Sequence, residues 1–162
     1  MAFAIIVSLY VSVGLMSAAG CIFISQEVLP VKFEAVFFGL FLIPIASFYL
    51  AFTAYFGAKE AWVLETAAVG AFVALGCAGT RIPVLLIAGY ALHGAWDLLH
   101  EVQAHLGTDA FYGREATQIP LAYGIFCATF DWCMAAYFYS RRAQWSSDAG
   151  TGLPPGKQTM RS

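Results

Sequence analysis

Five long apolar stretches divide this sequence, and they constrain its fold more than any other feature. A helix needs about 20 mainly apolar residues to cross the hydrocarbon core of a bilayer, and each stretch reaches that length. Their approximate ranges are 2–25, 34–56, 60–78, 82–106 and 119–139. Pro30 follows the first stretch, while Pro83 and Pro120 fall in the first turns of the last two, where a missing N–H is tolerated. The sequence therefore predicts an all-α integral membrane bundle of five transmembrane helices in one domain, residues 1–140.

The composition supports a membrane protein. Hydrophobic residues make up 60% of the chain and charged residues 11%, against roughly 25% charged residues in a typical soluble domain. A soluble chain of 162 residues has too little interior to bury so much apolar surface, whereas lipid can solvate it. The net charge of −2 and the lack of a basic patch argue against a nucleic-acid partner. The four cysteines lie singly in apolar stretches, which predicts free, buried thiols.

The orientation follows from the basic residues between the predicted helices. The N-terminal stretch lacks a positively charged start and stays apolar to Ile24, so it is read as a retained first helix and not as a secretory signal. The side with more lysine and arginine should face the cytoplasm, and with five spans that side carries Lys32, Arg81, Arg141 and Arg142, against Lys59 and Arg114 opposite. We therefore predict a multi-pass protein of the inner cell membrane with its N-terminus outside. Residues 141–162, rich in Gly, Ser, Pro and Thr, are predicted to be a disordered cytoplasmic tail.

Polar residues form a stripe on the fourth predicted helix. At about 100° per residue, His93, Asp97 and His100 fall within an arc of roughly 60°. Tyr90 and Trp96 flank this arc, and Glu101 lies at its edge. An ionisable side chain at the centre of a membrane helix costs roughly 2.5 to 3.5 kcal/mol, so the stripe should face protein or water.

Two further acids should lie near this stripe. Asp131 is near the middle of the fifth predicted helix, at a depth similar to that of His93, on a face with small residues that permit close helix approach. Glu65, in the third predicted helix, lies toward the same outer side as His100. Three helices therefore direct polar groups at one region in the outer half of the membrane. The competing interpretation is a purely structural hydrogen-bond network, and His105 is read as a solvated residue at a loop edge.

The leading hypothesis is an intramembrane enzyme that uses acid–base chemistry. A carboxylic acid buried beside a histidine can exchange a proton near neutral pH, which suits an isomerase, cyclase or hydratase acting on an isoprenoid-like or other lipophilic substrate. His93 and Asp131 would transfer the proton, Asp97 would orient the histidine, and Glu65 and His100 would support them. Aromatic side chains suit a carbocation-like intermediate. The predicted substrate-binding residues are Tyr90, Trp96, Glu101 and Trp132.

Two alternatives stay open at this point. A metal ion held by residues from the set His93, Asp97, His100 and Asp131 would make the protein a metal-dependent membrane lipid hydrolase. His93 and His100 are about 10.5 Å apart along the helix axis, too far to chelate one ion together. The other alternative is a non-enzymatic accessory subunit that binds haem or a pigment. The leading hypothesis needs no cofactor. Its partners are membrane lipids, a lipophilic substrate and a second copy of the chain, packed through small-residue faces such as that of Gly14 and Ala18.

The motifs of the last two predicted helices resemble those of known membrane proteins. Leu92-His93, Trp96-Asp97 and His100 resemble the LHxxWDxxH motif of a family of small bacterial polytopic membrane proteins. That family has a glycine, cysteine and aspartate pattern in its last span, which Gly124, Cys127 and Asp131 would fill with a looser spacing. The resemblance implies a polytopic membrane protein and no particular reaction. His93 and Asp97 are also similar in spacing to the His-x-x-x-acid pair of the emopamil-binding sterol isomerases, although the helix order differs.

Overall fold

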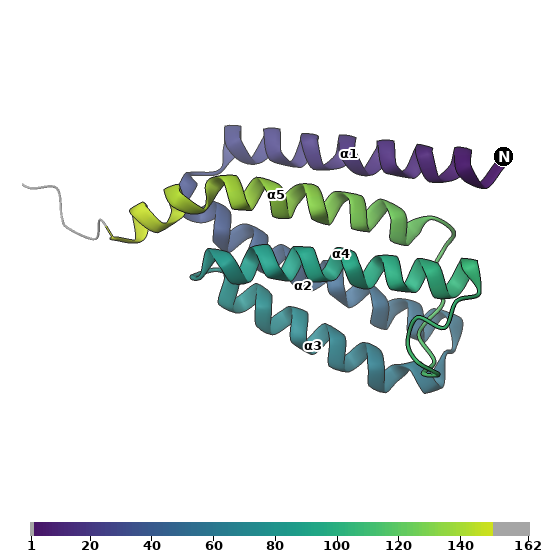
Figure 1. Ribbon diagram of the computed structural model, residues 1–162. Coiled ribbons are helices and arrows are strands. Elements are labelled where there is room, and N and C mark those ends of the chain that lie inside the picture. Colours follow the sequence, from purple (N-terminus) through teal and green to yellow (C-terminus); the bar gives the residue numbers. More distant parts are fainter. Residues whose placement is uncertain (1, 151–162) are drawn as a thin grey trace, which may run out of the picture.

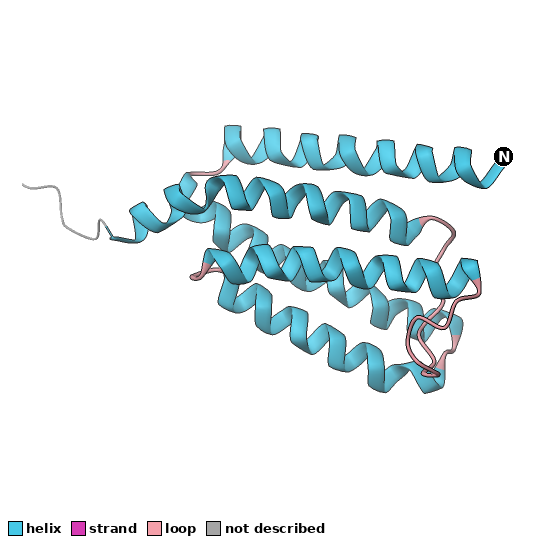
Figure 2. Cartoon of the chain, in the orientation of Figure 1, coloured by secondary structure: helices cyan, strands magenta, loops and turns pink. Residues whose placement is uncertain are grey.

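The computed structural model describes residues 2–150, with side chains through residue 145. Within that range the chain forms five α-helices, one 3-10 turn and no strand, so the predicted all-α class is confirmed. The elements are α1 (Ala2–Val28), α2 (Val31–Phe56), η1 (Lys59–Ala61), α3 (Trp62–Gly79), α4 (Pro83–Leu106) and α5 (Tyr123–Gly150). The helices lie side by side and alternate in direction, with every connection at one of the two ends of the bundle (Figures 1 and 2).

Three helical segments of the described chain are long and apolar enough to cross a membrane: α1, α2 and the segment Lys59–Gly79 that combines η1 and α3. The outside of the bundle is correspondingly apolar. Its exposed side chains include Ile5, Met16, Phe23, Ile24 and Val63. Both observations indicate a membrane protein, since large exposed apolar surfaces are rare on soluble monomers. Of the five predicted spans, three are supported by length and composition.

Four pairs of helices make most of the contacts in the bundle. The main contacts join α4 to α5, α2 to α3, α1 to α5, and α3 to α4. The main core lies between α2, α4 and α5 and is built from Phe38, Leu42, Leu86, Tyr90, Met134 and Phe138. The first helix α1 makes its extensive contacts with α5 (Figure 1) and adds Ala18 to this core.

The start of α5 differs from its predicted position at residue 119. The helix begins at Tyr123, after Ala122 has adopted a left-handed backbone conformation with φ 61°. Glu101 fixes this start from α4, because its two carboxylate oxygens accept hydrogen bonds from the N–H groups of Ala122, at 2.8 Å, and Gly124, at 3.0 Å. These N–H groups lie at a helix N-terminus, where an anionic acceptor is favourable. Glu101 therefore caps α5.

The end of α5 also differs from the prediction. Residues 141–150 are helical, where the sequence predicted the beginning of a disordered tail, while residues 151–162 of that tail lie outside the described residues. The buried carboxylate of Glu34 on α2 explains the longer helix. It accepts hydrogen bonds from Arg141 (2.7 and 3.0 Å), Tyr137 (2.7 Å), Trp145 (2.9 Å) and Ser25 (3.2 Å). We call this set the Glu34 cluster; it ties the C-terminal part of α5 to α2.

Candidate functional site

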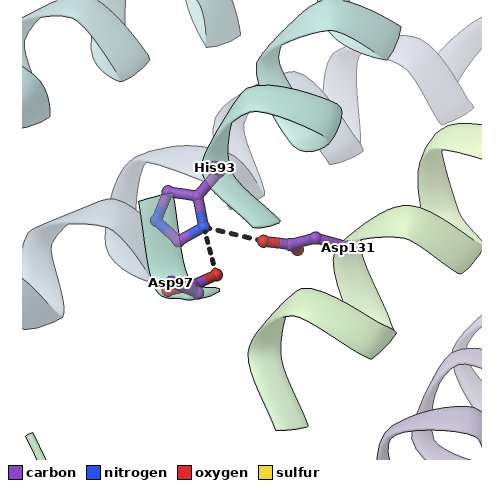
Figure 3. A group of neighbouring side chains, drawn as sticks. All are labelled: His93, Asp97 and Asp131. Atoms are coloured by element: carbon purple, nitrogen blue, oxygen red, sulfur yellow. Dashed lines mark hydrogen bonds and ion pairs between the residues drawn. The ribbon is translucent and has the colours of Figure 1, made fainter. Parts of the chain in front are cut away.

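The centre of the candidate site is a triad of His93, Asp97 and Asp131. Nδ1 of His93 lies 2.7 Å from Oδ2 of Asp131 on α5 and 3.1 Å from Oδ2 of Asp97, one turn further along α4. All three side chains are buried. Figure 3 shows the imidazole of His93 turning this one nitrogen toward both carboxylates. The structure therefore brings together the three residues to which the sequence analysis gave the central roles.

A close approach of α4 to α5 positions this triad. Gly94, next to His93, faces α5: a Cβ atom here would lie 3.2 Å from Cβ of Asp131 and 2.9 Å from Nε1 of Trp132. Contacts this short are tighter than ordinary van der Waals packing, so a larger residue would push the helices apart. Gly124 on α5 allows a second close approach of the two helices, because its Cα faces the backbone carbonyl of Asp97 on α4.

A fourth side chain, Tyr49, completes the triad from α2. Its hydroxyl donates a hydrogen bond to Oδ1 of Asp97, and the whole side chain is buried. The sequence analysis missed this residue. Tyr49 lies in a long apolar stretch, where an aromatic residue is expected to pack against its neighbours. No spacing in the sequence links it to Asp97.

The hydrogen-bond pattern leaves reactive atoms without partners. Nδ1 of His93 is hydrogen-bonded to Oδ2 of Asp131, whereas Oδ2 of Asp97, at 3.1 Å from the same nitrogen, has no hydrogen-bond partner. Nε2 of His93 and Oδ1 of Asp131 are buried and have no hydrogen-bond partner. Buried polar atoms without a partner are uncommon and often mark functional sites, because leaving one unpaired costs free energy.

A second buried pair, Glu65 and His100, lies beside the triad. Nε2 of His100 is 2.9 Å from Oε1 of Glu65, and its Nδ1 donates a hydrogen bond to the carbonyl of Trp96 at 3.1 Å. The N–H of Thr117, in the loop before α5, donates to the same Glu65 oxygen at 2.9 Å. The ring of Tyr49 lies between the two sites, with its centroid 4.4 Å from that of His100 and 6.0 Å from that of His93.

The four predicted substrate-binding residues do not contact the triad through their polar groups, and each has another environment. The hydroxyl of Tyr90 donates to the carbonyl of Phe38 in the core, and Glu101 caps α5. Trp96 packs against His100, with ring centroids 5.1 Å apart. Trp132 is 46% exposed on the outside of the bundle and donates from Nε1 to a backbone carbonyl. His105, expected to be solvated, is partly exposed, with Nε2 4.0 Å from Glu101.

An apolar hollow adjoins the triad at Asp131. It lies between α1, α2 and α5, has a volume of about 220 Å³, and is lined by Ser17, Phe41, Ile45, Phe48, Tyr123, Phe126, Cys127, Phe130 and Asp131. A mostly apolar wall with a few polar groups, here Ser17, Tyr123 and Asp131, is typical of ligand sites. We call this space the Asp131 hollow. None of the four predicted substrate-binding residues lines it.

The triad also has the composition of a metal site. His93, Asp97 and Asp131 each offer a ligand atom, and these atoms lie within 4.8 Å of one another. His100, the fourth predicted ligand, is paired with Glu65 instead. Carboxylate oxygens with one imidazole suit zinc, iron or manganese, so the donor set fits such an ion. Haem fits less well, because the His93 ring packs edge-on against Phe72, with centroids 4.8 Å apart.

Comparison of the chain with protein families, with curated proteins and with solved structures finds no match.

Proposed function

We propose that this protein is an intramembrane enzyme that uses the His93–Asp131 pair for acid–base chemistry on a lipophilic substrate, as an isomerase, cyclase or hydratase. One observation carries the proposal: Asp131 is hydrogen-bonded to His93 and also forms part of the wall of an apolar hollow. A proton-transfer pair next to a space that excludes charge suits a substrate dissolved in the membrane.

The proposal includes five membrane spans. The helices α4 and α5 have 24 and 28 residues, comparable with the 21 to 27 residues of the three apolar helical segments, and they run beside those segments (Figure 1). Their lower hydropathy reflects acids such as Asp97, Glu101 and Asp131, which are buried against protein and do not meet lipid. Five spans put the basic end of the bundle, with Lys32, Arg81 and Arg141, in the cytoplasm and the N-terminus outside the inner cell membrane.

The proposed reaction conserves atoms and electrons. A protonated Asp131 donates its proton to one carbon of a double bond, and the neighbouring carbon becomes a cation. Loss of a proton from the next carbon to the Asp131–His93 pair then gives the shifted double bond and restores the site. Capture of the cation by water, with loss of one water proton to the Asp131–His93 pair, gives hydration instead. Capture by a second double bond forms a ring and a new cation, and loss of a proton from that cation to the same pair completes cyclisation.

Each part of the site has a role in this scheme. Asp97 accepts from Tyr49 and holds His93 by Nδ1, so that the imidazole can return a proton to Asp131. The aromatic rings of Phe41, Phe126 and Phe130 in the hollow would stabilise the cation through their π faces.

Deuterium exchange tests the proposal before the substrate is known. The purified protein, in vesicles made in D₂O, is incubated with a lipid extract, and mass spectrometry follows deuterium that becomes bound to carbon. The native protein should label a component of the extract, and Asp131→Asn and His93→Gln should lower the rate by about 100-fold or more. Glu115→Gln, in an exposed acid of the loop before α5, is the control. Native-like labelling by both site variants would refute the proposal.

A metal-dependent lipid hydrolase is the second candidate, favoured by the ligand geometry of the triad. His93, Asp97 and Asp131 would hold the ion, which would supply an activated water for ester hydrolysis. Elemental analysis of the purified protein separates the two candidates. About one zinc, iron or manganese per chain, lost in Asp97→Asn, would support the hydrolase, whereas chelator-insensitive deuterium labelling supports the metal-free scheme.

A further inference from the structure

The helix α1 is fastened to the bundle mainly through α5. Gly14 and Ala18 form its buried contact with α5, and a Cβ atom at Gly14 would lie 2.9 Å from both the carbonyl oxygen of Phe126 and Cβ of Thr129. Toward α2 the described part of α1 makes few contacts, among them the hydrogen bond from Ser25 to Glu34 near its C-terminal end, although only residues 29 and 30 connect the two helices. A long seam therefore separates α1 from α2.

Two hollows lie along this seam. The first is the Asp131 hollow. The second has a volume of about 210 Å³ and is lined by Cys21, Ile24, Ser25, Val28, Leu29 and Phe37. The two are one helical turn apart: Ser17 is followed by Cys21 on α1, and on α2 the ring of Phe41 stacks on that of Phe37, with centroids 5.7 Å apart. The seam is therefore hollowed at two neighbouring places along residues 17–28 of α1.

The lining defines what the seam can hold. Asp131 is the only ionisable acid or base of the Asp, Glu, Lys, Arg and His types in either lining. An anionic group would have no partner here, and the one acid that could pair with a cationic group, Asp131, is already bonded to His93, so burying a charge would carry a high free-energy cost. Together the two hollows reach the lower part of the roughly 300 to 1,000 Å³ that ligand pockets usually have. A slender, uncharged chain meets both conditions.

The position of Asp131 along the seam restricts which carbon of a bound chain could react. On α1, Ser17 lines the hollow beside Asp131, and Val28 lies 11 residues further on, at the end of the seam. At a rise of 1.5 Å per residue, the two are about 16 Å apart. A group next to Asp131 thus lies deep in the membrane, far from where a lipid headgroup would reside.

We propose that the seam binds one apolar lipid chain of the isoprenoid or acyl type, lying lengthwise between α1 and α2, with a double bond in the interior or tail of the chain next to Asp131. The substrate would be a single-chain, uncharged lipid that reacts away from its head end. The reaction in this statement rests on the proposed function, but the binding of the chain does not.

Photo-crosslinking tests the seam directly. The probe is a 15-carbon isoprenoid alcohol with a diazirine near its tail, added to the protein in phosphatidylcholine vesicles. Peptide mass spectrometry should find labels on the seam faces, near Phe41, Ile45 or Phe126, and an excess of the unlabelled alcohol should compete. A two-chain phosphatidylcholine with the same diazirine should label the outer faces instead. Equal labelling of seam and outer faces by the alcohol would overturn the proposal.

Two tryptophan variants of neighbouring residues provide the matched comparison. Ser17→Trp fills the Asp131 hollow and should lower seam labelling by about tenfold, which corresponds to about 1.4 kcal/mol of binding free energy. Met16→Trp adds the same side chain on the outer face of α1, where Met16 is 74% exposed, and should leave labelling unchanged. Unchanged labelling in Ser17→Trp, with native-like unfolding, would also contradict the proposal.

Asp131→Asn distinguishes the two proposals. If both are correct, this variant keeps the seam labelling and loses deuterium transfer. Labelling without any transfer in the native protein would leave the seam as a lipid-binding site and refute the proposed enzyme. Transfer without seam labelling would refute the seam as the substrate site.

Discussion

The hydroxyl of Tyr49 donates a hydrogen bond to Oδ1 of Asp97 across the interface between α2 and α4, and so fixes the carboxylate that holds His93. The two residues are 48 positions apart in the chain, and both are buried. This contact makes Tyr49 a positioning residue of the triad. It also links α2, which otherwise supplies packing and the wall of the Asp131 hollow, to the proposed chemistry.

Tyr49→Phe should therefore impair the reaction more than substrate binding. Removing the hydroxyl leaves Asp97 with one buried oxygen unpaired and frees its other oxygen to leave His93. We expect kcat in the deuterium-transfer assay to fall by about tenfold, the equivalent of about 1.4 kcal/mol in barrier height, with KM little changed. Tyr55→Phe, on the same helix but 82% exposed, is the control. A loss confined to KM would argue against a positioning role.

The sequence predicted the triad because helical periodicity fixes what lies on one face and at one depth. His93 and Asp97 are four residues apart, so they must share a face of α4, and Asp131 was placed at the depth of His93 by counting along α5. Such spacing does not determine how one helix is rotated about its axis relative to another. Tyr49 could for that reason not be told from the other aromatic residues of α2.

The differences have equally physical causes. Trp132 was assigned to the site because an aromatic ring suits a carbocation-like intermediate, but it follows Asp131, and the next residue on a helix points about 100° away, so Trp132 is 46% exposed on the outside of the bundle. Glu34 was only the first residue of the second predicted helix. Its role depends on Arg141, 107 residues later, which no local pattern reveals. The helical extension of α5 was missed with it.

The Glu34 cluster should contribute to stability and not to the reaction. Glu34→Ala leaves Arg141 without its carboxylate, and Tyr137 and Trp145 without an acceptor. Removing one partner of a fully buried ion pair costs about 3 to 5 kcal/mol, and we expect roughly 2 to 3 here because the Arg141 side chain is 18% exposed. Thermal unfolding in detergent measures this effect. Glu27→Ala, an exposed acid on α1 near the same end of the bundle, should leave the midpoint unchanged.

The folded fraction of Glu34→Ala should keep its deuterium transfer, since the cluster does not contact the triad. A midpoint equal to that of the native protein would show that the cluster does not hold α5 against α2. Loss of transfer at full stability would instead connect this end of the bundle to the reaction.

Gly94→Ala should separate His93 from Asp131. The added methyl group would meet Cβ of Asp131 at 3.2 Å, and the backbone of α4 must shift because that atom is close to the backbone of α5. Gly70→Ala is the control, since nothing lies within 4 Å of its Cβ position on α3. There the gain in helix propensity should raise stability by about 0.5 to 1 kcal/mol. In Gly94→Ala, both the midpoint temperature of thermal unfolding and the rate of deuterium transfer should fall. In Gly70→Ala, neither should fall. Equal behaviour of the two would mean that the close approach is not required.

The three histidines of the chain allow the two buried pairs to be followed without any substrate. In protein labelled with ¹⁵N-histidine, the imidazole signals of His93, His100 and His105 report which ring nitrogen carries a proton. The hydrogen bond to the Asp131 carboxylate should place a proton on Nδ1 of His93, and the bond to the Trp96 carbonyl should place one on Nδ1 of His100. Asp131→Asn should change the chemical shifts of His93 alone. Glu65→Gln should change the chemical shifts of His100 alone. Tyr49→Phe should shift the signals of His93, because the lost hydroxyl holds Asp97, and change those of His100 little, because phenylalanine keeps the ring that lies against His100. The signals of His105 should stay constant throughout, and a His93 that keeps its native shifts in Asp131→Asn would show that the pair at the centre of the site does not form.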